Sequence, residues 1–389
     1  MAILISATGD SDPIRDFHDG ALLHIARKYR PEKIVVIYSE RTFEKREKIE
    51  LAIRSIPDYN PMIISHDEVL DNNEVYQFDA MFEKISTIIQ HYLEDGELIL
   101  NLSSATPQIK SAFFVANRLN DLNVKAVQVL APSHSSNEGI PHSNNEELQD
   151  LIENNFDNVE NFEDRTVEDL SEKFSITLLK RNLKNLILHY DYKAALDMLM
   201  QDSSFYGLKT LRENLEDMVS SHNHQRIPRG LQKKKLSDDE KKILNSFLLI
   251  DLQKKRGNLS ESLIRLKTLS EFLLEFIITK SHPNAIDDYL VENDKGTLNL
   301  LDYRSILKQK RMWALQNQIK SVVAVNKSRN QVAHSLEPLD AENIKYLGRA
   351  LRDIKNLIRE HTSIPSHLFE FYDQFNQECC ELLKIKERT

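Results

Sequence analysis

Residues 2–8 read AILISAT and residues 33–38 read KIVVIY, and these two runs decide the fold. Each is a short aliphatic run without alternating polar positions, which is typical of a strand buried on both faces of a parallel sheet. Further runs of this kind lie at 62–64, 98–100 and 124–130. Between the runs, apolar residues recur at helical spacing, as they do from Tyr76 to Ile89. The alternation predicts a doubly wound, Rossmann-like α/β domain.

The chain changes character after the last of these runs. Residues 132–165 are rich in Asn, Ser and acidic residues, which predicts a surface connection with one short helix. From about residue 166 the apolar pattern is helical, and Leu259–Phe276 and Ile344–Ile358 mark two long core-facing helices. We therefore predict four parts, which are an α/β domain (1–135), a connector (136–165), an all-α middle region (166–235) and an all-α C-terminal domain (236–389).

The bulk composition limits the class of protein. The 389 residues carry a net charge of −9, which argues against a protein that coats DNA. No apolar run reaches the length of a membrane span, and no basic region precedes an apolar one at the N-terminus, so we expect neither a membrane protein nor a signal peptide. The two cysteines, Cys379 and Cys380, are adjacent on a predicted helix, which fits a reducing cytoplasm.

Two polar loops follow the first and fourth predicted strands. In an open parallel sheet, ligands bind beyond the carboxyl ends of the strands. Thr106 and Pro107 are suited to be the N-cap and first residue of a helix, whose free N–H groups and positive end would then face the loop. We expect the loops to bind phosphate groups, although hydroxyls that only cap helices are the alternative. The predicted binding residues are Thr8, Gly9, Asp10, Asp12, Arg15, His18, Asn101, Ser103, Ser104, Ala105, Thr106 and Lys110.

Several familiar motifs are missing from the sequence. No G-x-G-x-x-G follows the first strand, and no G-x-x-x-x-G-K-[ST] is present, which counts against hydride transfer and nucleotide hydrolysis. His222 and His224 form an H-x-H without further ligands, so we expect exposed connector residues and no metal. The single tryptophan, Trp313, is expected to pack in the helical core.

Residues 328–335 read SRNQVAHS and place Arg329 five residues before His334. RNA carries its own nucleophile, the 2′-hydroxyl, so a proton-transfer group and a cation are sufficient to cleave it. Histidine and arginine supply these two functions. On a regular helix Asn330 and His334 share a face, whereas Arg329 and His334 point about 140° apart. Such a site would straddle a helix start or combine two copies across a two-fold axis. A surface arginine and a packed histidine are the alternative.

Four segments together resemble the Csm-type ancillary ribonucleases of type III CRISPR systems. They are SATGDSDP (6–13), FHDGALLHIARKY (17–29), NLSSATPQIKSA (101–112) and SRNQVAHS (328–335). The resemblance spans most of the chain in the expected order. It implies a Rossmann-like CARF domain, an all-α middle region and an all-α HEPN domain. It also implies a homodimer whose CARF domains bind cyclic oligoadenylate, with cyclic hexaadenylate preferred to cyclic tetraadenylate, and whose HEPN domains cut single-stranded RNA.

The resemblance also assigns roles to residues. Arg329, Asn330 and His334 become the nuclease site, and the two polar loops become the activator site. RNA would be cleaved without metal or cofactor to 2′,3′-cyclic phosphate ends, in the cytoplasm, with no membrane partner and no stable DNA binding. Slow cleavage of the activator by the CARF domain, with a contribution from Thr106, is a further implication.

Two other functions remain open. A ligand-gated CARF-type nucleic-acid-binding regulator without nuclease activity would need a basic helix-turn-helix, and the C-terminal helices are long and apolar-striped instead. A metabolic Rossmann enzyme with a helical lid would carry a glycine-rich fingerprint after its first strand, and this sequence has none there.

Overall fold

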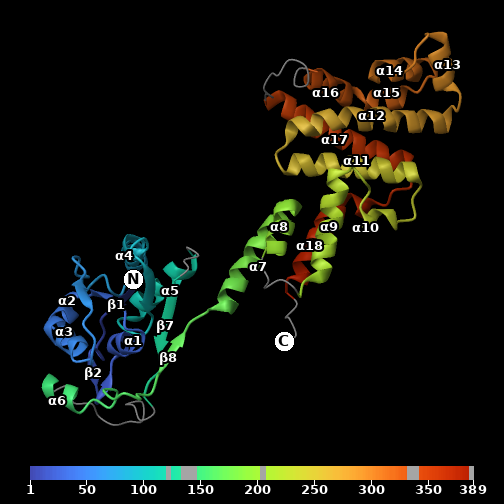
Figure 1. The fold of residues 1–389 in the computed structure, drawn as a ribbon. Coiled ribbons are helices and arrows are strands. Elements are labelled where there is room, and N and C mark those ends of the chain that lie inside the picture. The colour runs from blue at the N-terminus through green and yellow to red at the C-terminus, as the bar shows by residue number, and fades with distance from the viewer. Residues whose placement is uncertain (120–123, 133–146, 202–206, 331–340, 385–389) are drawn as a thin grey trace. The chain divides into compact units, whose positions relative to one another are not determined.

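The structure is a computed structural model that describes residues 1–119, 124–132, 147–201, 207–330 and 341–384 (Figure 1). The chain folds into two compact units, Met1–Ser175 and Ile176–Thr389, which we treat separately below.

The first unit is built on a six-stranded sheet of order β5-β4-β1-β6-β7-β8. The five predicted strands are confirmed as β1 (Ala2–Ala7), β4 (Lys33–Ile37), β5 (Met62–Ser65), β6 (Glu97–Asn101) and β7 (Lys125–Val129). Neighbours among these five pair in parallel. The last strand, β8 (Thr166–Glu168), pairs antiparallel with β7 where the sequence pattern predicted helix. Three residues are too few to show a period, so this edge strand left no signal in the sequence.

Helices cover both faces of this sheet, which confirms the doubly wound architecture (Figure 1). One face carries α1 (Ala21–Tyr29), α3 (Arg46–Arg54) and α6 (Leu148–Glu153), and the other carries α4 (Phe78–Tyr92) and α5 (Pro107–Leu119). Leu4 packs into the first core, whereas Ile3 and Ile5 pack into the second. A strand with two buried faces needs apolar residues at successive positions, and this explains the continuous runs in the sequence.

Short elements shape the ends of the strands. The hairpin β2 (Ile14–Arg15) and β3 (His18–Asp19) follows the loop after β1. Helix α2 (Glu40–Phe43) follows β4 and begins with a capping box between Ser39 and Thr42.

The second unit is helical, and its core is built around α12 (Leu259–Ser281). This helix packs against α11 (Asp238–Lys255), α14 (Leu300–Gln309), α16 (Lys320–Asn330) and α17 (Ala341–His361). The predicted long helices are confirmed as α12 and α17 (Ala341–His361). Helix α7 (Glu172–Leu188) leads into the unit. The other helices are α8 (Tyr192–Gln201), α9 (Lys209–Asn223), α10 (Arg229–Gln232), α13 (Ala285–Glu292), α15 (Trp313–Gln318), η4 (Ser366–Glu370) and α18 (Phe371–Leu382). Within the described residues, none of the helices has the length and apolar composition that a bilayer crossing requires.

Two predictions about single side chains in this unit are wrong. Trp313 is 51% exposed, because it opens the short helix α15 whose buried position is Leu315. His222 is half-buried on α9 instead of exposed in a connector, and its Nε2 lies 3.1 Å from the hydroxyl of Tyr372. Burial lowers the pKa of His222 to about 4.

Candidate functional site

The loop after β1 is held in shape by two of its own buried side chains. Asp12 is 2% exposed, and its carboxylate accepts hydrogen bonds from the backbone N–H groups of Gly9 at 2.8 Å and Leu22 at 3.2 Å. Burial raises the pKa of Asp12, against the effect of these donors. Thr8 is buried as well, and its hydroxyl donates to Thr42 Oγ1 at 2.7 Å. Asp12 and Thr8 therefore stabilise the conformation of the loop through buried hydrogen bonds.

Lys45, which precedes α3, was not predicted and holds the same loop from the other side. Its Nζ donates to the carbonyl oxygens of Gly9 at 3.2 Å, Asp10 at 2.9 Å and Asp12 at 3.2 Å. Burial lowers the pKa of Lys45. The carboxyl ends of β1 and β4 share one sheet edge, so the basic run 45–48 after β4 was the available signal.

The loop after β6 is organised by Asn101, which is fully buried. Its Nδ2 donates to Ser6 Oγ at 2.8 Å and Ser104 Oγ at 3.0 Å, and its Oδ1 accepts from the N–H of Ser103 at 2.8 Å. The predicted ligand residue Asn101 thus uses both ends of its amide inside the protein. Its bond to Ser6 also ties the loop to β1.

The hydroxyl groups of this loop differ in their hydrogen-bond partners. Thr106 caps α5 as predicted, since its Oγ1 accepts from Ile109 N at 3.4 Å, and the same hydroxyl donates its hydrogen to the carbonyl of Val75 at 2.9 Å. Ser103 Oγ accepts from Val129 N at 2.8 Å, which leaves its hydrogen available to an anion. Lys110 lies half-buried in the first turn of α5.

The two predicted loops meet backbone to backbone. A Cβ atom placed on Gly9 would lie 2.8 Å from the backbone nitrogen of Ala105, which only a glycine allows. Ala105 has φ +82°, in the left-handed region that costs a residue with a side chain about 1–3 kcal/mol. The structure therefore brings residues 8–12 and 101–106 together at the carboxyl edge of the sheet, next to the N-terminus of α5.

Arg15 and His18 belong to the hairpin that follows the first loop, and Asp10 belongs to the loop itself. Asp10 is exposed and pairs with Arg41 of α2. Arg15 Nε lies 3.7 Å from the carboxylate of Asp16. The His18 ring packs on Phe156 at 5.2 Å between centroids, which ties the hairpin to the connector.

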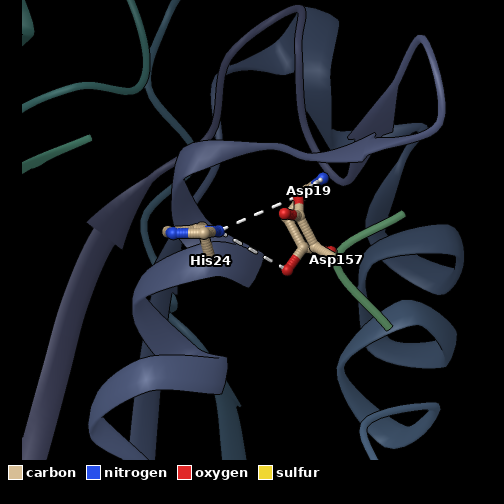
Figure 2. Close-up of side chains that lie close together, drawn as sticks. All are labelled: Asp19, His24 and Asp157. Atoms are coloured by element: carbon tan, nitrogen blue, oxygen red, sulfur yellow. Dashed lines mark hydrogen bonds and ion pairs between the residues drawn. The ribbon is translucent and has the colours of Figure 1, made fainter. Parts of the chain in front are cut away.

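A buried charged cluster fixes this hairpin to α1 and the connector (Figure 2). Asp19, His24 and Asp157 place one potential metal ligand each within 4.8 Å of one another. Both carboxylates, however, already face a guanidinium group. Arg27 donates to the two oxygens of Asp19 at 2.7 and 3.1 Å, and Arg165 donates to Asp157 at 2.8 Å. The charges in the cluster are therefore balanced without a cation.

The histidine of this cluster is also fully engaged. His24 Nε2 accepts the backbone N–H of Arg165 at 3.0 Å, and its Nδ1 lies 3.2 Å from Arg165 Nη2 and 3.8 and 3.9 Å from the carboxylates of Asp19 and Asp157. Burial, followed by the charge of Arg165, lowers the pKa of His24 to about 4. Nε2 is occupied by a backbone N–H and Nδ1 faces the guanidinium group of Arg165, which would repel a cation, so the cluster does not fit a metal site.

The predicted nuclease segment is described only in part. Arg329 and Asn330 are the last two residues of α16, and His334 lies outside the described residues. The predicted joint action of these three residues therefore stays a prediction.

Comparisons with known proteins identify the family. The family model of the Cas_Csm6 CARF domain matches residues 62–166, and that of the Cas_Csm6 HEPN domain matches residues 230–321. The CRISPR system endoribonuclease Csm6' of Streptococcus thermophilus is 52% identical over 379 residues, covering 97% of this chain and 98% of that protein. The chain belongs to the Csm6 family. The CRISPR system endoribonuclease Csm6 of the same organism is 37% identical over 99% of this chain and 100% of that protein.

A solved structure shows the same fold as this Csm6-family chain. It is Enterococcus italicus Csm6 bound to cyclic hexa-2'-fluoro-hexa-dAMP, with a TM-score of 0.70, 23% identity, and coverage of 98% of this chain and 100% of that one. The predicted fold class, a Rossmann-like CARF domain followed by helical regions that include a HEPN domain, is confirmed.

Proposed function

We propose that this chain is a cyclic oligoadenylate-activated endoribonuclease of type III CRISPR defence that cuts single-stranded RNA without a metal ion. The proposal rests on the meeting of two polar loops at the CARF sheet edge, in a chain whose relatives are named CRISPR endoribonucleases. We assign the CARF sensor to residues 1–135, with the connector (136–165) and β8 (Thr166–Glu168) completing its unit. We assign the middle region to the remainder of 166–235 and the nuclease to 236–389, and expect a cytoplasmic homodimer.

The proposed cleavage uses the 2′-hydroxyl of the RNA as the nucleophile. His334 moves a proton from this hydroxyl or to the leaving 5′-oxygen, Arg329 stabilises the charge that develops on the phosphorane, and Asn330 orients the histidine or the phosphate. The products are a 2′,3′-cyclic phosphate and a 5′-hydroxyl. Because Arg329 and His334 are five residues apart, we place the site at a two-fold interface where two copies contribute.

We propose cyclic hexaadenylate as the activator, in preference to cyclic tetraadenylate. The ring phosphates would be held by the Gln108 N–H at the positive end of α5, the Ser103 hydroxyl and Lys110. The activator would bind one arrangement of the two sensors better than another, which biases the nuclease interface. We also propose slow cleavage of the ring by the CARF domain. A contribution from Thr106 would require its hydroxyl to release Val75.

The decisive experiment is cleavage of an unstructured RNA with each cyclic oligoadenylate and without any, in the presence of EDTA. Activity should require the activator, survive EDTA and fail on RNA with a 2′-deoxy group at the scissile position. His334→Ala and Arg329→Ala should lower the rate by about 100-fold or more. Substitution of two exposed residues of the same unit, His367→Ala and Arg352→Ala, should leave it unchanged. Loss of activity in EDTA, or cleavage at a 2′-deoxy position, would contradict the mechanism.

A further inference from the structure

The segment 71–77, between β5 and α4, crosses the sheet edge where the two activator loops meet. Its first part is fixed to α2, because Arg41 N donates to Asn72 Oδ1 and Asn72 N donates to Glu40 Oε2, both at 3.2 Å. Its last part is fixed to the second loop, because Thr106 Oγ1 donates to the carbonyl of Val75 at 2.9 Å. Both ends of the crossing are therefore held by hydrogen bonds.

Tyr76 follows the anchored residue Val75 directly and is 62% exposed, although Val75 itself is buried. Backbone contacts on the segment tie the tyrosine to both loops. Val75 O accepts from Thr106 Oγ1 of the second loop, and Asn72 accepts from the backbone N–H of Arg41, whose side chain pairs with Asp10 of the first loop. An aromatic ring is thus presented to solvent beside the groups that we expect to hold phosphates.

We propose that Tyr76 stacks on an adenine base of the activator and so contributes to its affinity, an inference that rests on the proposed function. Hydrogen bonds to phosphate hold the backbone of a nucleotide, whereas an aromatic side chain binds the flat face of a base. The backbone is held before Tyr76 by Val75 and after it by Gln77, whose N–H donates to the carbonyl of Glu74 at 2.7 Å. The segment therefore loses little freedom on binding, and the stacking energy is retained as affinity.

The ring could instead contact a second copy of the chain, and the test separates these roles. Tyr76→Phe keeps the ring, Tyr76→Leu keeps an apolar side chain without a ring, and Tyr76→Ala removes both. Leu93→Ala is the control, since Leu93 is an exposed apolar residue at the opposite end of α4, about 22 Å along the helix. The full-length variants are titrated with fluorescent cyclic hexaadenylate by anisotropy, and their oligomeric state is measured by size-exclusion chromatography with light scattering.

Tyr76→Phe and the control should bind within about two-fold of the wild type. Tyr76→Leu and Tyr76→Ala should bind about 5- to 150-fold more weakly, with unchanged oligomeric state, and full RNA cleavage should return at saturating activator. Equal binding by the Phe and Leu variants, wild-type binding by Tyr76→Ala, or weakened binding that accompanies a change in oligomeric state would each overturn the inference. A wild-type chain that binds no cyclic oligoadenylate would instead refute the proposed function.

Discussion

Removal of the Asp157 carboxylate should destabilise the α/β unit strongly. Asp157 comes from the connector and is almost fully buried, and its Oδ2 accepts from the N–H of Asp19 at 2.7 Å and from Arg165 at 2.8 Å. In Asp157→Ala, the guanidinium of Arg165 stays buried but loses its carboxylate partner, and the N–H of Asp19 loses its acceptor. Each group then carries its desolvation cost without compensation.

The size of the loss follows from these contacts. Breaking a buried ion pair by removing one partner costs about 3–5 kcal/mol, whereas an exposed pair of helix neighbours contributes about 0.3–0.5 kcal/mol. The matched control is Glu50→Ala on α3, which removes a partly exposed pair with Arg46 in the same unit. For a unit of this size we expect the melting temperature to fall by about 6–20 °C in Asp157→Ala and by less than about 2 °C in the control.

Calorimetry and circular dichroism would measure the transition of the α/β unit, while fluorescence of Trp313, the single tryptophan, follows the helical unit. Asp157→Ala should lower the melting temperature of the α/β unit and leave the transition reported by Trp313 fluorescence unchanged. The double variant Asp157→Leu/Arg165→Met should lose less than the sum of the single losses, since it leaves no unpaired charge. If Asp157→Ala lies within about 0.5 kcal/mol of Glu50→Ala, the cluster is not the anchor that its geometry indicates.

Three further outcomes are expected. In the folded unit the pKa of His24 is lowered to about 4, whereas in the unfolded chain it is near 6.5. Below pH 6.5 the unfolded chain therefore binds a proton that the folded unit does not. Up to about 3 kcal/mol of the free energy of unfolding should be lost as pH falls from 6.5 to 4. Acid titration of His24→Gln should show a flatter curve. Lys45→Met should cost about 1–3 kcal/mol in urea unfolding and weaken activator binding, through its three lost carbonyl contacts. Asn101→Ala should lower both the stability of the fold and the affinity for the activator, because it removes the hydrogen bonds to Ser6 and Ser104. Lys110→Ala should lower the affinity alone. Thermal shift with and without cyclic hexaadenylate measures the two quantities.

The sheet could be predicted because its signal is local. Residues 3–5 and 34–37 are buried on two faces, so each position had to be apolar, and the run is visible without knowledge of its neighbours. The long helices α12 and α17 were predicted for a similar reason, since a wide apolar stripe repeats over several turns.

The charged cluster could not be predicted because its partners are far apart in sequence. Asp19 and Asp157 are separated by 138 positions, and the acidic connector suggested a solvated surface. A charge is buried only where an opposite charge from another segment meets it, and no pattern within the connector shows that Arg27 and Arg165 converge there.

The two polar loops were predicted at the sheet edge where the structure has them, but residue type did not show which polar groups bond within the protein and which face solvent. Asn101 and Asp12 satisfy their hydrogen bonds within the protein, and Lys45 occupies carbonyl oxygens of the first loop. A loop whose acceptors are already occupied presents mainly donors outward, which favours an anion. Such a loop also needs little reordering to bind, so the polar residues that touch no ligand can contribute as much to affinity as those that do.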